Sequence, residues 1–171
     1  MHTKVVLAFS GGLAARVALH VLRMRNGFEV ITLTPNLGQQ ADPEDISDRA
    51  IELGAEAAHV SDLRARFAEE FVFPALRAGA VHEGGCPLSA ALARPLVVAE
   101  TVKIARQEGC TAIAHGATGL GNDQVRFETA AVALAPDLRV FHPLRDQGLQ
   151  SFENCLEYAA NHDLRPTQGE R

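Results

Sequence analysis

Aromatic residues are scarce in this sequence, which contains no tryptophan and a single tyrosine. Side chains on which nucleic-acid bases could stack are therefore few. Basic residues are also outnumbered, because 16 lysine and arginine residues stand against 21 aspartate and glutamate residues, for a formal net charge of −5. They are scattered along the chain rather than grouped, whereas nucleic-acid-binding proteins concentrate them on one face, so we expect no nucleic-acid partner.

Long hydrophobic runs and cysteines are equally few. No stretch is apolar for long enough to span a membrane, and the first four residues lead directly into a predicted strand, so neither a membrane partner nor a signal peptide is expected. The three cysteines are odd in number and widely spaced, which argues against a disulfide framework. These absences predict a cytoplasmic, globular protein, and 171 residues suffice for one domain with a full core.

Short apolar segments alternate along the chain with amphipathic segments of helical period. The predicted strands are residues 4–9, 29–34, 55–60, 111–114 and 138–141, and the predicted helices are residues 13–24, 43–53, 63–73, 90–108, 123–134 and 151–161. Strands that alternate with helices form right-handed βαβ crossovers. The predicted fold class is therefore α/β, with a doubly wound, parallel five-stranded sheet and helices on both faces.

Domain limits and two prolines complete the predicted outline. We expect a single domain over residues 1–164, followed by a polar tail at 165–171. Pro74 is expected to interrupt the helix that it follows, or to begin a second short helix. Pro95 is a candidate for the true first turn of the longest predicted helix.

Two glycine-rich turns join predicted strands to predicted helices. The apolar residues 5–9 run directly into Ser-Gly-Gly at 10–12, and residues 115–123 form a similar turn after the fourth strand. Glycines let backbone N–H groups approach an anion, and the start of the following helix adds a favourable dipole. Both turns lie at carboxyl ends of strands, so they face one crevice if the first and fourth strands are neighbours. This pattern predicts a nucleotide-type site.

Several segments resemble known family motifs. Residues 5–13 resemble the pyrophosphate loop of the N-type ATP pyrophosphatases, and residues 34–39 resemble the Thr-Ala-Asp-Leu-Gly-Gln segment of argininosuccinate synthases. Residues 71–76 and 91–95 resemble signature segments of the same family. Residues 115–128 are close to its most specific motif. The resemblance covers nearly the whole chain and implies an adenine nucleotide alpha hydrolase-like, Rossmann-like fold.

The resemblance implies an ATP-dependent ligase. In the family, ATP activates the ureido oxygen of citrulline as an adenylate with release of pyrophosphate, and the aspartate amine then displaces AMP. The implied cofactor is ATP or AMP, with Mg²⁺ where ATP is bound productively. The residues implied to line the ATP site are Ala8, Phe9, Ser10, Gly11, Gly12, Pro35 and Gly116. The residues implied to bind an aspartate-like amino acid or citrulline are Thr118, Asn122, Asp123 and Arg126, since Arg pairs with carboxylates and Asp holds ammonium groups.

The first glycine-rich turn departs from the family pattern. Ala14, Ala15 and Arg16 stand where the family has Asp, Thr and Ser, so side chains that help to hold the triphosphate and its magnesium are missing. Arg16 either meets phosphate itself or is a solvated helix residue. Cys86 replaces a citrulline-contacting Tyr and Leu120 replaces a Lys.

Two further functional hypotheses remain open beside an altered ligase. The sequence stops at residue 171, without the family's synthetase domain. The chain is then expected to self-associate or to pair with a partner chain that supplies the missing part. Alternatively it is a non-catalytic interaction or regulatory protein that kept the fold, or a fragment of a longer protein.

No catalytic base and no metal site are expected from the sequence. His82, Glu83 and Cys86 are grouped in one loop, but a closed four-ligand zinc set is not visible. His115 is expected to support the backbone of the second turn by a hydrogen bond, and Cys110 and Cys155 are expected to be core residues.

Overall fold

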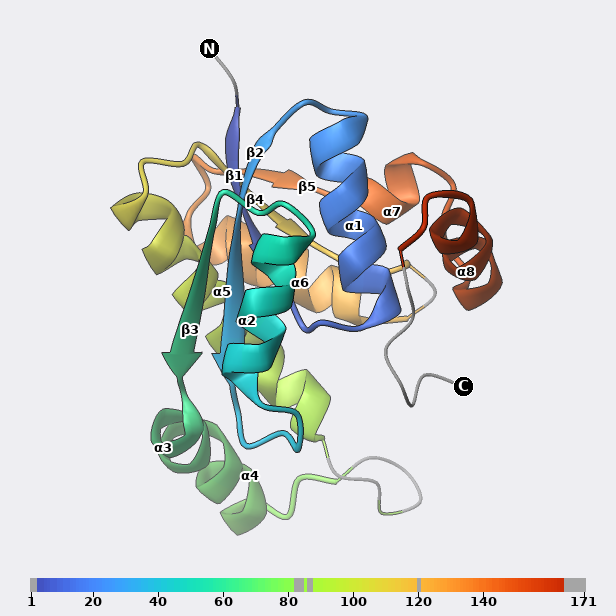
Figure 1. The fold of residues 1–171 in the computed structure, drawn as a ribbon. Coiled ribbons are helices and arrows are strands. Elements are labelled where there is room, and N and C mark those ends of the chain that lie inside the picture. The colour runs from blue at the N-terminus through green and yellow to red at the C-terminus, as the bar shows by residue number, and fades with distance from the viewer. Residues whose placement is uncertain (1–2, 82–84, 86–87, 120, 165–171) are drawn as a thin grey trace.

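The computed structural model of this chain describes residues 3–81, 85, 88–119 and 121–164 (Figure 1). Cys86, Leu120, the His82–Glu83 pair and the predicted tail at 165–171 lie outside the described residues. The strands are β1 (Lys4–Ala8), β2 (Glu29–Asn36), β3 (Ala57–Asp62), β4 (Ala112–His115) and β5 (Arg139–Phe141). The helices are α1 (Leu13–Met24), α2 (Pro43–Glu52), α3 (Arg64–Phe67), the π-helical segment η1 (Ala68–Val72), α4 (Phe73–Arg77), α5 (Ser89–Gln107), α6 (Asp123–Leu134), α7 (Pro143–Asp146) and α8 (Phe152–Asn161).

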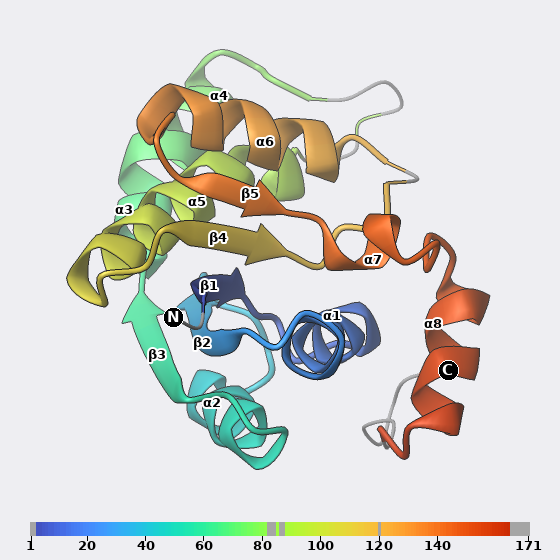
Figure 2. The ribbon, with the colours of Figure 1, turned by 90° about the horizontal axis from the view of Figure 1, so that it is seen from above.

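The five strands form one all-parallel sheet in the order β3-β2-β1-β4-β5. The central strand β1 pairs with β2 through Val6 and Ile31 and with β4 through Val6 and Ile113. The chain therefore builds outward from β1 in one direction and then crosses to the other side. Helices α1 and α2 cover one face of the sheet, and α5 and α6 cover the opposite face (Figure 2). The predicted α/β, doubly wound fold is confirmed.

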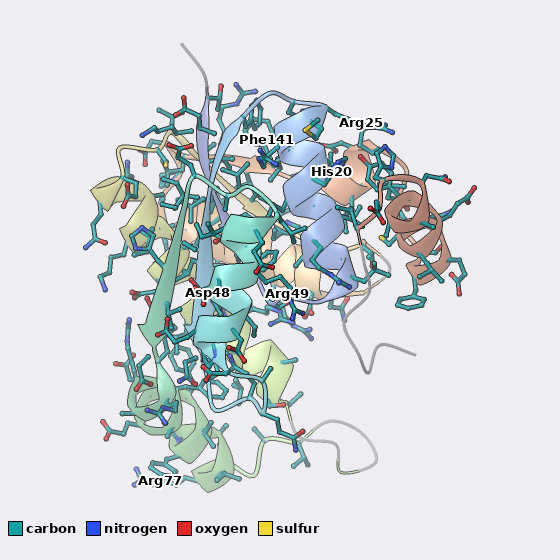
Figure 3. All side chains as sticks on the ribbon, in the orientation of Figure 1. His20, Arg25, Asp48, Arg49, Arg77 and Phe141 are labelled. Atoms are coloured by element: carbon teal, nitrogen blue, oxygen red, sulfur yellow. The ribbon has the colours of Figure 1, made fainter. Side chains whose placement is uncertain are left out.

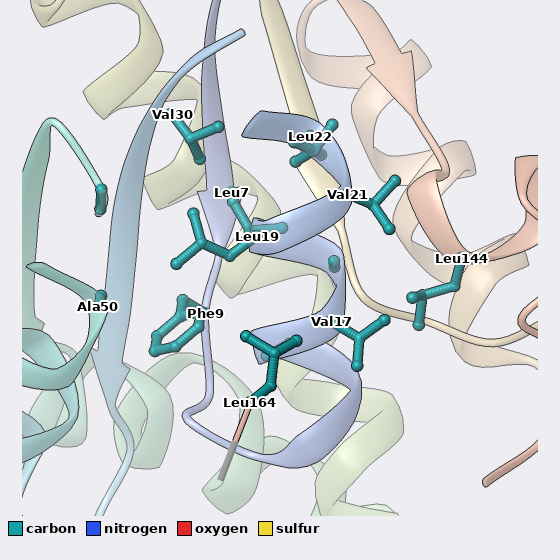
Figure 4. Packing of buried hydrophobic residues seen from close by; sticks show 14 of the residues in the cluster. Leu7, Phe9, Val17, Leu19, Val21, Leu22, Val30, Ala50, Leu144 and Leu164 are labelled. Atoms are coloured by element: carbon teal, nitrogen blue, oxygen red, sulfur yellow. The ribbon is translucent and has the colours of Figure 1, made fainter. Parts of the chain in front are cut away.

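Alternate residues of β1 belong to two hydrophobic clusters, as the two-residue period of a strand requires. Leu7, together with Phe9 just after the strand, packs with Leu19 of α1 on one face (Figure 4). Val6 belongs to the cluster on the other face, which includes Val98 of α5. All five side chains are almost completely buried, which explains why this central segment reads as a continuous apolar run.

Helix α8 closes one side of the molecule by packing along α1. The Tyr158 hydroxyl lies 3.0 Å from Nδ1 of His20, and the Arg25 guanidinium lies over the Tyr158 ring. Figure 3 labels His20 and Arg25 on the α1 side of the contact between α1 and α8. Cys155 of α8 and Cys110 are both buried, which confirms that they are core residues.

The two prolines behave differently from each other. Pro74 lies in the first turn of the short helix α4, where an amide is not needed, so the expectation that it begins a second short helix is confirmed. Pro95 does not mark the start of its helix, because α5 begins at Ser89. Burial of Ala93 and Leu96 on either side of Pro95 holds this helix together despite the missing amide. The short helix α7 was not predicted, because its four residues are too few to show a period.

Within the described ranges, no helix is both long enough and apolar enough to cross a lipid bilayer.

Truncation of a central core side chain should destabilise the whole sheet. Leu7→Ala should lower the free energy of unfolding by about 2–5 kcal/mol, because it removes a fully buried side chain and leaves a cavity. Leu76→Ala is the matched control, since Leu76 is 69% exposed and its loss should change stability by less than about 0.5 kcal/mol. Urea unfolding of both variants measures the difference, and equal effects would contradict this description of the core.

Candidate functional site

A pocket of about 420 Å³ lies at the carboxyl ends of β1, β2 and β4. It contains residues from both glycine-rich turns, from the loop after β2 and from the starts of three helices. Five of the seven residues that the resemblance implied for the ATP site line it, namely Ala8, Phe9, Ser10, Pro35 and Gly116. The position agrees with the rule that ligands of open parallel sheets bind where the strand order reverses.

The first turn depends on glycine at position 11. Gly11 has φ of +77°, and a Cβ there would lie 3.1 Å from the side chain of Ile46. Gly12 precedes α1 as its N-cap and offers no side chain to cap the helix. Neither glycine is among the lining residues of the pocket. Gly11 instead allows the left-handed turn that follows Ser10, which itself lines the pocket.

The two glycine-rich turns contact each other. A Cβ on Gly116 would lie 3.3 Å from the carbonyl oxygen of Ala14 and 3.3 Å from Cα of Ala15. Both neighbours are backbone atoms, so the position admits no larger residue without moving one of the turns. The adjacent pairing of β1 and β4 causes this approach. The prediction that the two turns face one crevice is confirmed.

The residues that depart from the family loop are largely enclosed. Ala14 and Ala15 both line the pocket, and Ala15 is only 4% exposed. Arg16 is 1% exposed and does not line the pocket. The interpretation of Arg16 as a solvated residue is therefore wrong, because α1 packs against α7 and α8 as well as against the sheet. The position of Arg16 at the start of a predicted helix did not show that α7 and α8 also pack against this helix.

Two arginines and one aspartate meet at the rim of the pocket. Arg94 Nη2 of α5 donates to Oδ2 of Asp123 at 2.7 Å, and Arg126 Nη1 lies 3.3 Å from Oδ1. Burial of Asp123 acts to raise its pKa, but the Arg94 and Arg126 guanidiniums outweigh burial and hold the pKa below its ordinary value. Two guanidiniums on one carboxylate leave the cluster with a net positive charge, which suits a negatively charged ligand.

Arg94 was missed as a site residue. The only signal was its place in residues 91–95, which resemble a family segment. Asp123 lines the pocket as expected. Thr118 and Asn122 do not line it, and Asn122 is exposed at the start of α6.

Two buried polar side chains lie in the pocket wall. The Ala117 amide donates to Nδ1 of His115 at 3.2 Å, which confirms the predicted backbone support. Burial, helped by nearby His142, lowers the pKa of His115 to about 4, so this ring is neutral at physiological pH. The Thr34 hydroxyl is buried and has no hydrogen-bond partner among the described residues. Sequence reasoning missed Thr34, because a threonine inside a strand usually signals only strand propensity.

Comparison with known proteins agrees with the family resemblance of the sequence motifs. Residues 4–165 match the family described as the Arginosuccinate synthase N-terminal HUP domain. The argininosuccinate synthase of Nitratidesulfovibrio vulgaris (strain DP4) is 51% identical over 94% of this chain, and that of Pelotomaculum thermopropionicum is 48% identical over 92%. These matches cover only 41% and 39% of the two relatives, so the chain spans about two fifths of their length.

A solved structure supports the fold alone. The crystal structure described as a predicted subunit of tRNA methyltransferase from Methanocaldococcus jannaschii has a TM-score of 0.63 to this chain at 15% identity. The likeness covers 92% of this chain and 76% of that one.

The rim cluster predicts an acid-dependent contribution to stability. A carboxyl whose folded pKa is depressed stabilises the fold above its unfolded pKa, and that contribution is lost as pH falls through the folded pKa. The stability advantage of the wild type over Asp123→Asn should therefore shrink once the pH drops below the ordinary value of 3.8. Urea unfolding at neutral and acid pH measures this. In an Arg94→Gln background the advantage should depend less on pH, and an unchanged dependence would contradict the pairing.

Proposed function

The chain belongs to the family of argininosuccinate synthase N-terminal HUP domains, and on this premise we propose that it binds an adenine nucleotide, ATP or AMP, in the pocket between its two glycine-rich turns. The observation that carries this proposal is the close approach of the turns, where a Cβ on Gly116 would lie 3.3 Å from the Ala14 carbonyl oxygen, beside a pocket of about 420 Å³. A cavity of this size is in the usual range for small-ligand sites.

The lining suits the parts of a nucleotide. The phosphates would lie by Ser10 and the Gly11–Gly12 turn, where the start of α1 has no side-chain cap and its dipole favours negative charge. Phe9 and Pro35 offer apolar surface to the base. The buried Thr34 hydroxyl lacks a hydrogen-bond partner among the described residues, so a polar ligand atom would satisfy it.

Protein ligands for magnesium fit poorly at this pocket. Asp123 is the one carboxylate among its described lining residues, and both of its oxygens face arginines. Ala14 and Ala15 offer no oxygen ligand from their side chains. We therefore assign nucleotide binding to backbone groups and apolar walls, and we give Mg²⁺ no step in this chain.

The rim cluster would hold an amino acid beside the nucleotide. The carboxylate of an aspartate-like ligand would pair with Arg94 and Arg126, and Asp123 would then be released to hold its ammonium group. Thr118 and Asn122 would add polar contacts from the same turn. All these roles are positioning and electrostatic ones.

The full family reaction would need more than this chain. Adenylation of citrulline and its ligation to aspartate would require contacts from outside residues 1–171, since the relatives are more than twice as long. We propose that this single domain, residues 1–164, is the nucleotide-binding part of such a site. A second copy or a partner chain would supply the rest.

A second candidate is a non-catalytic interaction protein that kept the fold. The observation that favours it is the apolar Ala14–Ala15 pair beside the pocket, where the family holds triphosphate with an acid and a hydroxyl. The two candidates differ in a direct way, because only the first requires nucleotide binding.

Filling the space between the turns should abolish nucleotide binding. Gly116→Val should weaken AMP and ATP binding by at least about tenfold, or about 1.4 kcal/mol, because its side chain meets the Ala14 and Ala15 backbone. Ala133→Val adds the same branched side chain at an exposed position of α6 and should not change binding. Calorimetric titration measures both affinities. No binding by the wild type up to millimolar nucleotide would instead favour the interaction protein.

Restoring one acid should create a dependence on magnesium. In Ala14→Asp the new carboxylate should repel the triphosphate without Mg²⁺ and bind the ion when it is present. We expect Mg²⁺ to raise the ATP affinity of Ala14→Asp by about tenfold more than that of the wild type, or about 1.4 kcal/mol. Ala133→Asp, which places the same charge on exposed α6, controls for net charge. An identical magnesium effect in both variants would argue against phosphate binding near Ala14.

A further inference from the structure

We propose that His115, Glu128 and His142 form a binding site for a divalent transition-metal ion of the zinc class, beside the nucleotide pocket. Nε2 of His115 lies 3.1 Å from Nδ1 of His142, and that Nδ1 lies 3.3 Å from Oε1 of Glu128. One ligand atom from each of the three side chains lies within 4.8 Å of the other two. This site needs no bound nucleotide and does not depend on the proposed function.

Two of the three separations between ligand atoms match a tetrahedral ion, and the third lies within 4.8 Å. Zinc binds imidazole nitrogen at about 2.0–2.1 Å, so two ligand atoms on a tetrahedron around it are about 3.3 Å apart. The two measured separations, 3.1 and 3.3 Å, are close to that edge. Two imidazoles and one carboxylate are the ligand types that zinc takes, and they leave a fourth position open.

Regular elements hold the three side chains in place. His115 ends β4, Glu128 lies on α6, and His142 immediately precedes α7. The ring of Phe127 packs on His115 with centroids 4.6 Å apart, and Gln124 Nε2 donates to Oε1 of Glu128 at 2.6 Å. Such outer contacts orient metal ligands and are part of a rigid site. The ligands come from separate segments, with the two histidines 27 residues apart, so no local spacing revealed them in the sequence.

Hydrogen bonds alone leave one unfavourable contact among His115, His142 and Glu128. The Ala117 amide donates to Nδ1 of His115, which puts the ring proton on Nε2, and that proton points to Nδ1 of His142. The same His142 nitrogen then presents its lone pair to the Glu128 carboxylate as well. A metal ion placed between the three ligand atoms would replace this repulsion between lone pairs with three favourable metal–ligand contacts.

Metal binding would also move the second glycine-rich turn. A neutral His115 ring that binds metal through Nε2 carries its proton on Nδ1, so the Ala117 amide must turn away from it. The cations that oppose an incoming metal ion are Arg145, whose Nη1 lies 3.7 Å from Glu128 Oε1, and Arg94. The site would therefore link metal occupancy to the position of the turn that borders the nucleotide pocket.

The test is a zinc titration of the full chain by competition with a coloured chelator. His142→Ala and Glu128→Gln should each weaken the tightest site by at least about tenfold, as loss of metal-site residues does. His59→Ala is the matched control, since His59 pairs with Glu108 at 2.9 Å without a second histidine, and it should leave zinc affinity unchanged. Circular dichroism verifies that each variant is folded.

Cobalt(II) provides a second readout on the same proteins. The wild type and His59→Ala should give the strong visible absorption of tetrahedral cobalt, and His142→Ala should lose it. Equal zinc affinity in the wild type and His142→Ala would overturn the proposal. So would the weak absorption of six-coordinate cobalt, or loss of binding in His82→Ala but not in His142→Ala.

Discussion

The rest of the structure depends on one close approach, that of the two glycine-rich turns across the β1–β4 boundary. Because β1 pairs with β4, the backbone after β4 reaches the first turn of α1, and a side chain at position 116 would press on the Ala14 and Ala15 backbone. This contact closes one side of the pocket and fixes where the starts of α1 and α6 lie relative to each other. The pocket is therefore a consequence of strand order.

Charge around the pocket is arranged to favour an anion. The start of α1 lacks a side-chain cap, and the rim joins two arginines to one aspartate. No compensating carboxylate stands at Ala14, where the family has an acid. The balance favours binding through backbone groups and arginines over binding through a protein-held metal. The proposed metal cluster borders the same pocket, because His115 lines the pocket wall and also lies 3.1 Å from His142.

Sequence patterns predicted the elements that are long enough to show a regular spacing of apolar residues. They failed where contacts between elements distant in the sequence determine the burial or the partner of a residue. The five strands, the helices α1, α2, α5, α6 and α8 and the meeting of the turns were all predictable, since apolar period and glycine positions are local signals. Burial of Arg16 was not predictable, because it depends on how α1 packs against other elements of the fold. Arg94 and the His115–His142 contact were missed for the same reason: each joins residues on different elements.

The most direct test of nucleotide binding between the turns is a set of backbone amide NMR spectra recorded during titration with AMP. We predict that the largest shift changes fall on the amides of residues 10–14 and 116–118, with smaller changes near Thr34 and little change on α8. Changes confined to other surfaces, or none at millimolar AMP, would contradict the proposal that this pocket is the nucleotide site.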